Sequence, residues 1–277
     1  MNIPKTEQRN PDSTHLDVMS TEEMARLVIT ANYDAVRAVE AARTEIAAAI
    51  DAITNAFNNG GRLFYVGAGT SGRLGILDAA ECPPTFGVPY DMVQGIIAGG
   101  NERMFTAGEG AEDKYEDGSK AIIERNVRAS DVVVGISAAG NAAYVVGALE
   151  EAKRQGAVTV GISSNPDTKI LRSANIPIFT DTGAEVLTGS TRLKAGTAQK
   201  IVLNTLTTCA MTQTGKVYEN LMINLAPSNE KLRKRVIRIV TEILSCTEKE
   251  ALALLEQNDW NIRRSVDTFN QKRGKIC

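Results

Sequence analysis

The amino-acid sequence predicts an α/β protein, built as a three-layer αβα sandwich around a mostly parallel sheet. Short runs rich in Val and Ile alternate with longer segments of helical periodicity through the middle of the chain. Near-continuous apolar strands of this kind are typical of parallel sheets that helices cover on both faces. Loops rich in Gly, Ser or Asn follow most of these runs. Right-handed crossovers are the default connection between such strands.

Helices are expected before the first strand. Ser20 and Glu23 have the spacing of a capping box, and apolar residues recur at helical intervals as far as Phe57. An Asn-Asn-Gly-Gly run then stops the second helix. We therefore expect an N-terminal helical segment over residues 1–54.

The sheet domain is expected over residues 55–218. Its predicted strands are residues 63–66, 92–97, 131–136, 158–162 and 176–179. One short predicted helix carries Glu81 at its far end, just before Pro83 and Pro84. The other predicted helices are the segments 107–126, 142–155 and 194–213.

The rest of the chain, residues 219–277, is expected to be helical. Helical periodicity returns at residues 231–244, 248–256 and 262–270, and we interpret these segments as a small terminal bundle. The Lys- and Arg-rich run at 231–235 is either a solvated helix face or a site for a polyanion. No internal repeat is evident.

Composition narrows the class of protein. The 277 residues are 43% hydrophobic and 23% charged, with a net charge of −2, which argues against a dedicated nucleic-acid binder. No apolar run approaches a membrane span, and the N-terminus lacks the apolar core of a signal peptide. The four Cys residues are scattered without C-x-x-C spacing, so neither zinc nor a disulfide framework is indicated. We expect a cytoplasmic protein with reduced thiols.

His15 is the only histidine, and this limits the chemistry available. A Ser-His-Asp triad, a histidine-rich metal site or a histidine base is hard to build from one residue in a polar N-terminal segment. Acid–base catalysis must then fall to carboxylates, lysine or tyrosine.

Residues 67–72, Gly-Ala-Gly-Thr-Ser-Gly, predict a phosphate site. They join an apolar strand to a helix, and free N–H groups at a helix N-terminus attract anions. Thr70, Ser71 and Gly72 supply hydroxyl and backbone donors. The same letters fit the dinucleotide pattern G-x-G-x-x-G, but the first acid after the second strand is Glu102, too late to hold a ribose. A purely structural glycine turn is the other alternative.

Long motifs resemble those of the N-acetylmuramic acid 6-phosphate etherases, bacterial enzymes that remove D-lactate from that sugar phosphate. The match covers most of the first 240 residues. The motifs are residues 6–11, 16–17, 20–21, 67–87, 95–100, 109–113, 131–136, 189–200, 215–218 and 220–222.

The resemblance implies the sugar isomerase (SIS) fold, a homodimer with its active site near the subunit boundary, and a C-terminal region similar to a ubiquitin-associated (UBA) fold. It implies no metal or cofactor, no nucleic acid and no membrane. Two catalytic glutamates carry over to Glu81 and Glu112. Glu81 is assigned as the acid that protonates the leaving lactate, and Glu112 as the base at C2. Without the resemblance, Glu112 would be interpreted as a solvated acid in an acidic stretch.

The resemblance also implies which residues meet the phosphorylated amino sugar. Thr70 and Ser71 are expected at its phosphate. Ser137, Ser190 and Thr191 are expected to assist. Lys194 either neutralises the phosphate or is surface charge, and Glu185 is a secondary candidate that could compete for the base role.

One loop departs from the family pattern. Residues 138–144 read Ala-Ala-Gly-Asn-Ala-Ala-Tyr, where the family commonly has Ala-Ser-Gly-Arg-Thr-Pro-Tyr. Ala139 and Ala142 thus lack hydroxyls, and Asn141 stands in place of an arginine. We expect weaker phosphate binding, by about 1–3 kcal/mol for each missing charged hydrogen bond. The change also keeps two other functions open, a non-catalytic phosphosugar sensor and an aldose–ketose phosphate isomerase.

Overall fold

The computed structural model describes residues 3–108, 110–224, 227 and 230–274. The chain forms two compact units, Met1–Ala80 with Asp91–Ala210, and Glu81–Tyr90 with Met211–Cys277. Each unit is described by itself. The domain boundaries expected after residues 54 and 218 stay predictions. Glu109, which belongs to one of the motifs, lies outside the described residues.

The first unit holds a five-stranded parallel sheet in the order β2-β1-β3-β4-β5. Apolar and often β-branched side chains make up these strands, and β1 and β3 are buried along their whole length. All five predicted strands are confirmed, with bounds that differ by at most one residue. The observed strands are β1 (Leu63–Gly67), β2 (Val93–Ile97), β3 (Val132–Ile136), β4 (Val158–Ser163) and β5 (Ile176–Phe179).

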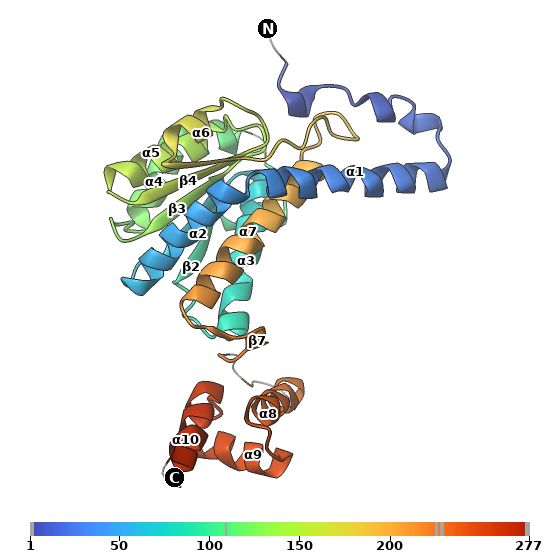
Figure 1. Ribbon diagram of the computed structural model, residues 1–277. Helices are drawn as coiled ribbons and strands as arrows, with labels where there is room; N and C mark the ends of the chain where they lie inside the picture. Colours follow the sequence, from blue (N-terminus) through green and yellow to red (C-terminus); the bar gives the residue numbers. More distant parts are fainter. Residues whose placement is uncertain (1–2, 109, 225–226, 228–229, 275–277) are drawn as a thin grey trace. The chain divides into compact units, whose positions relative to one another are not determined.

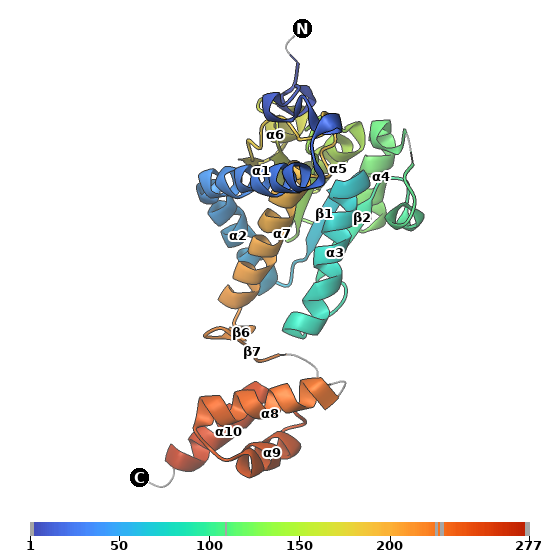
Figure 2. The same ribbon diagram turned by 90° about the vertical axis from the view of Figure 1, so that its right-hand side faces the viewer.

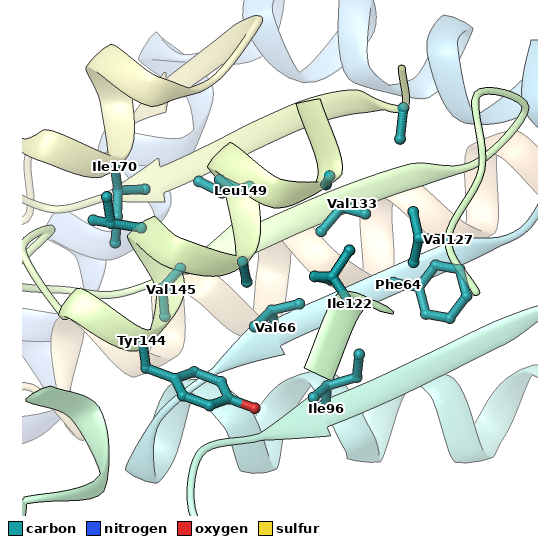
Figure 3. Close-up of a cluster of buried hydrophobic side chains, with 14 of the residues drawn as sticks. Phe64, Val66, Ile96, Ile122, Val127, Val133, Tyr144, Val145, Leu149 and Ile170 are labelled. Atoms are coloured by element: carbon teal, nitrogen blue, oxygen red, sulfur yellow. The ribbon is translucent and has the colours of Figure 1, made fainter. Parts of the chain in front are cut away.

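Helices cover both faces of the sheet, so the predicted three-layer sandwich is confirmed (Figures 1 and 2). On one face lie α4 (Tyr115–Glu124), α5 (Ala143–Arg154) and α6 (Lys169–Ser173), and on the other α2 (Arg43–Asn58), α3 (Gly69–Phe86) and α7 (Lys194–Gln213). Figure 3 shows the core of the first face, where Phe64, Val66 and Val133 of the strands meet Ile122 and Leu149.

Short 3-10 turns and a long helix precede α2. The turns are η1 (Lys5–Glu7), η2 (Pro11–Ser13) and η3 (Leu16–Val18), and the helix is α1 (Thr21–Ala41). Ser20 and Glu23 form the predicted capping box at the start of α1. The N-terminal helical segment is therefore confirmed as two helices.

Two sequence predictions of helices need correction. The helix expected over 107–126 is only α4, preceded by the 3-10 turns η4 (Asn101–Met104) and η5 (Ala111–Asp113). Gly110 has a φ of 74°, a left-handed conformation that interrupts a helix. In contrast, α3 continues through Pro83 and Pro84 to Phe86. Proline's fixed φ suits a helix, although each ring removes one N–H donor, and Gly87 then ends the helix.

The second unit is helical apart from a small hairpin, β6 (Val217–Tyr218) and β7 (Leu221–Met222). Its helices pack around a core that includes Val236, Val240 and Leu255. The predicted terminal bundle is confirmed as α8 (Glu230–Leu244), α9 (Glu248–Gln257) and α10 (Ile262–Gly274). None of the helices in the described part of the chain is long and apolar enough to cross a membrane.

Candidate active site

The strand order marks one edge of the sheet as the place for a ligand. Strand β1 pairs with β2 on one side and with β3 on the other, and Gly67 is in register with both Ile97 and Ile136. The carboxyl ends of these strands therefore lie side by side. In open sheets of this order, ligands bind outside the carboxyl ends at the switch point between β1 and β3. The loops that follow these two strands flank that point.

The first loop is a tight glycine turn from β1 into α3. A Cβ on Gly72 would lie 2.6 Å from Ile97 Cγ1 and 2.7 Å from the Gly67 carbonyl oxygen, so only glycine fits there without a shift. Gly69 has a φ of +53° with open space around it. The first N–H groups of a helix lack intrahelical partners, so the turn presents donors and the positive helix end to an anion. The predicted strand–turn–helix is confirmed.

The two hydroxyl residues of this turn are held against α7. A Cβ on Gly196 would lie 3.6 Å from Thr70 Cγ2, so Thr70 borders the first turn of α7. Ser71 is buried, and its hydroxyl donates to Gln199 Oε1 at 2.9 Å. The N-terminal turns of α3 and α7 are therefore neighbours at the same sheet edge.

The second loop follows β3 and is bonded differently. Ser137 Oγ accepts a hydrogen bond from the backbone N–H of Gly140 at 3.0 Å. A hydroxyl has one donor and two acceptor positions, so this bond leaves its O–H for a ligand. Asn141 Oδ1 accepts from the Lys169 N–H at 3.2 Å. Asn141 thus binds the start of α6.

Glu185 is fully buried, and both its oxygens are occupied. They accept hydrogen bonds from the backbone N–H groups of Lys194, at 3.0 Å, and of Ala195, at 2.9 Å. A carboxylate at a helix N-terminus is stabilised by the helix dipole as well as by these bonds. Glu185 therefore caps α7 and closes the loop that carries the half-buried Ser190 and Thr191. Contact of Glu185 with a substrate stays a prediction.

Lys194 is buried rather than on the surface. Its Nζ lies 3.1 Å from Asp34 Oδ2 of α1, and the residue is only 3% exposed. A buried ammonium is costly unless it is paired, so Asp34 offsets its charge. The surface-charge alternative is thereby excluded.

Glu112 lies in η5, is exposed, and belongs to the same sheet edge. The neighbouring Ala111 packs on Gly99, directly after β2, because a Cβ on Gly99 would lie 3.2 Å from Ala111 Cβ. The preceding segment is fixed by Arg73 of α3, whose guanidinium donates to the carbonyl oxygens of Met104, at 3.0 Å, and Thr106, at 3.1 Å.

Glu81 is an exposed residue of α3. It belongs to the second compact unit, whereas Thr70 belongs to the first. One turn earlier, the buried Asp78 accepts hydrogen bonds from Tyr65 at 2.9 Å and from Asn204 at 2.6 Å. α3 thus carries a phosphate-type turn at its start and a carboxylate three turns later.

Sequence reasoning missed three residues that shape this edge, Arg73, Asp78 and Gln199. All three lie inside the quoted motifs, but their partners are distant in the chain, so no local pattern revealed their roles. Within the described residues, no three His, Cys, Asp or Glu side chains are grouped as a metal site requires.

Comparisons with known proteins agree with the class that the fold and this edge define, the SIS-domain proteins. The SIS domain model matches residues 113–209, and the model of the glucokinase regulatory protein N-terminal SIS domain matches residues 45–153. A phosphoheptose isomerase from Francisella tularensis has the same fold, with a TM-score of 0.52 at 15% identity over 70% of this chain and 100% of that one.

Closer relatives identify the family. The N-acetylmuramic acid 6-phosphate etherase 2 of Vibrio cholerae is 50% identical over 94% of this chain and 85% of its own length. The etherase of Symbiobacterium thermophilum is 50% identical over 94% of this chain and 87% of its own length. That of Clostridium botulinum is 46% identical over 98% and 90%. The chain belongs to the N-acetylmuramic acid 6-phosphate etherase family.

Proposed function

We propose that this protein cleaves the D-lactyl ether of N-acetylmuramic acid 6-phosphate, giving N-acetylglucosamine 6-phosphate and D-lactate. This reaction recycles a cell-wall amino sugar in the cytoplasm. Family membership supports the reaction. The observation that supports it is the shared sheet edge, where the glycine turn into α3 presents backbone donors and where η5, which carries Glu112, packs through Ala111 on Gly99 after β2.

The substrate phosphate is proposed to bind at the switch point. Thr70, Ser71 and Gly72 would hold it at the start of α3, with Ser137 on the other side. Ser190 and Thr191, in the loop that Glu185 closes, would contact it or the sugar. Lys194 adds positive charge behind this loop, although Asp34 offsets much of it. Helix N-termini and hydroxyl donors are the usual means of binding a phosphate without a metal.

The chemistry is an elimination followed by a hydration. In the open-chain sugar, the ether at C3 is β to the C1 aldehyde, which acidifies the C2 proton. Glu112 takes that proton, the C3–O bond breaks, and Glu81 gives a proton to the departing lactate oxygen. Water then adds to C3 and a proton returns to C2, so one water is consumed overall. General acid and general base each contribute typically about 10²–10⁴-fold in rate.

A homodimer with its active site near the subunit boundary is proposed, as the family resemblance implies. An unpartnered apolar face on α1 supports such pairing, because Ile29 is 66% exposed, Tyr33 60% and Val36 51%. Exposed apolar patches of this kind mark association surfaces.

The test is incubation with N-acetylmuramic acid 6-phosphate in deuterated, ¹⁸O-labelled water. We expect lactate release, with deuterium at C2 and ¹⁸O at C3 of the product. Glu112→Gln should abolish both C2 exchange and release. Glu81→Gln should lose release but keep exchange at C2. Glu116→Gln is the matched control, because Glu116 is an exposed acid nearby in the sequence, in the first turn of α4, and the activity of this variant should be unchanged.

Other outcomes would point to the alternatives. A wild-type protein that binds the sugar phosphate without releasing lactate would be a phosphosugar sensor. Interconversion of aldose and ketose without loss of lactate would indicate an isomerase. Loss of both exchange and release in Glu81→Gln, with Glu112→Gln still exchanging, would assign the base role to Glu81.

A further inference from the structure

A buried hydrogen bond ties the proposed phosphate turn to α7. Ser71 lies in the first turn of α3 and Gln199 in the second turn of α7, and Ser71 Oγ donates to Gln199 Oε1 at 2.9 Å. Gln199 is 1% exposed and Ser71 8%. The pair lies beside the contact between Thr70 and Gly196, where both helices begin.

The donors in this pair do not match the proposed ligand. A serine hydroxyl has one hydrogen to donate, and Ser71 gives it to Gln199, so a phosphate would meet only its lone pairs. Gln199 Nε2, in turn, is buried and has no hydrogen-bond partner among the described residues. An unsatisfied buried donor is costly. In this arrangement the Ser71 O–H is not available to a phosphate, and the Gln199 Nε2–H donates to nothing among the described residues.

We propose that Gln199 is a positioning residue whose carboxamide turns over when phosphate binds. Half a rotation about its terminal torsion exchanges Oε1 and Nε2. Nε2 then donates to Ser71 Oγ, and the released Ser71 O–H donates to a phosphate oxygen. This inference rests on the proposed phosphate site. It adds that the orientation of the Gln199 amide determines whether Ser71 can donate to the phosphate.

The side chain is suited to such an exchange. The terminal torsion of glutamine is broad and roughly two-fold, unlike the staggered torsions of its stem. Either orientation leaves one amide atom bonded to Ser71 and the other without a partner, so the two orientations differ little in hydrogen bonding. A ligand that bonds only to the Ser71 donor selects one of them. The helix backbone around Gln199 stays fixed, because Glu185 caps α7.

Substitutions at both positions test the exchange, with N-acetylglucosamine 6-phosphate as the ligand in calorimetry. Ser71→Ala should weaken binding about 10-fold, the usual loss for one hydrogen bond to a charged group. Gln199→Glu can only accept, so it keeps Ser71 engaged and adds a negative charge; binding should weaken about 100-fold. Gln199→Met removes the acceptor, and Ser71 becomes free to donate, so binding should change less than threefold.

The decisive measurement is the coupling between the two positions. Ser71→Ala should cost about 10-fold again in the Gln199→Met background and less than twofold in the Gln199→Glu background, where the Ser71 donor is already lost. In turnover, Gln199→Glu should raise KM with little change in kcat. Asn204→Leu is the matched control, because it breaks a polar bond elsewhere on α7. It should lower the melting temperature and leave the affinity unchanged.

Three results would overturn the proposal, and they are distinguishable. If Gln199→Glu binds the sugar phosphate as tightly as wild type, the exchange is wrong and the etherase function stands. The same holds if Ser71→Ala costs equally much in all three backgrounds. If the wild-type protein does not distinguish N-acetylglucosamine 6-phosphate from unphosphorylated N-acetylglucosamine, the phosphate site itself is wrong and both proposals fall.

Discussion

The two loops at the switch point look alike in sequence but differ in which donors they offer. The turn after β1 contains two hydroxyls, and Ser71 uses its only hydrogen on Gln199. The loop after β3 contains one hydroxyl, and Ser137 uses only a lone pair, on the N–H of Gly140. Ser137 therefore has a hydrogen available to donate to a ligand, whereas Ser71 does not.

This difference shows that the number of Ser and Thr residues in a loop does not by itself determine its affinity for phosphate. A hydroxyl contributes to anion binding only when its hydrogen is not already committed. The second loop has alanines at 139 and 142, where the family resemblance leads us to expect hydroxyls. It keeps Ser137, which donates no hydrogen bond among the described residues. The comparison predicts that Ser137 is the stronger contributor to binding and that Ser71 contributes only after a rearrangement.

The largest expected effect is a loss of stability when the turn glycine of each loop is replaced by alanine, and it should differ between the two loops. Gly140 has a φ of +76°, and a Cβ there would lie 2.3 Å from Ser163 Oγ, whereas Gly69 has a φ of +53° with nothing within 4 Å. Gly140→Ala combines left-handed strain with overpacking and should destabilise by about 2–5 kcal/mol. Gly69→Ala carries the strain alone, about 1–2 kcal/mol. Thermal unfolding of both variants checks this order, and equal losses would contradict it.

The next prediction compares the two serines directly. Ser137→Ala should weaken binding of N-acetylglucosamine 6-phosphate by about 30–100-fold, because it removes an uncommitted donor and the bond that orders Gly140. Ser71→Ala should cost about 10-fold, since its donor must first be released from Gln199. Calorimetry with the phosphorylated and unphosphorylated sugar measures both. A larger loss for Ser71→Ala would reverse the assignment of the two loops.

Most of the fold was predictable because its signals are local. The strand predictions succeeded at β1 and β3 because each is a short apolar run between polar turns, a pattern that suits a sheet covered on both faces. The helix expected over 107–126 was wrong before Tyr115, where α4 begins. Gly110 there adopts a left-handed φ of 74°, which composition does not reveal. The short helix before Pro83 was also wrong, because α3 accommodates both prolines.

The site was predictable only in part. Long motifs pointed to Thr70, Ser71 and Glu112, and the strand register brings the loops after β1 and β3 to one edge of the sheet. The hydrogen-bond state of Ser71 depends on Gln199, which lies 128 positions away, so no local pattern contains it. Glu185 was expected near the sugar, and Lys194 either at the phosphate or on the surface. The helix cap made by Glu185 and the ion pair made by Lys194 are tertiary contacts that the sequence does not specify.

A smaller effect is expected from restoring the family's hydroxyls to the second loop. Ala139 is exposed, so Ala139→Ser adds a free donor and should tighten binding by about 3–10-fold. Ala142 is the N-cap of α5 and has no side-chain cap. Ala142→Thr should therefore satisfy the helix instead, raising stability by about 0.5–1 kcal/mol with unchanged affinity. Calorimetry and thermal unfolding on both variants separate the two outcomes, and tighter binding in Ala142→Thr alone would contradict them.

The smallest expected effect concerns Asp78, which joins α3 to β1 and α7. Burial raises the pKa of Asp78, although hydrogen bonds from Asn204, Tyr65 and Thr207 partly oppose the shift. A raised folded-state pKa means that the protonated form is favoured in the folded protein. Its stabilising contribution is complete below the unfolded value of 3.8 and is lost as pH rises through the folded value.

Comparison with Asp78→Asn isolates this contribution, because the amide does not ionise. The unfolding free energy of the wild type relative to Asp78→Asn should fall as pH rises from about 4 toward neutrality. Denaturant unfolding at a series of pH values gives this difference directly. A relative stability that rises over the same window would mean that the hydrogen bonds from α7 and β1 outweigh burial. The ionised Asp78 carboxylate would then stabilise the packing of α3 against α7 instead of destabilising it.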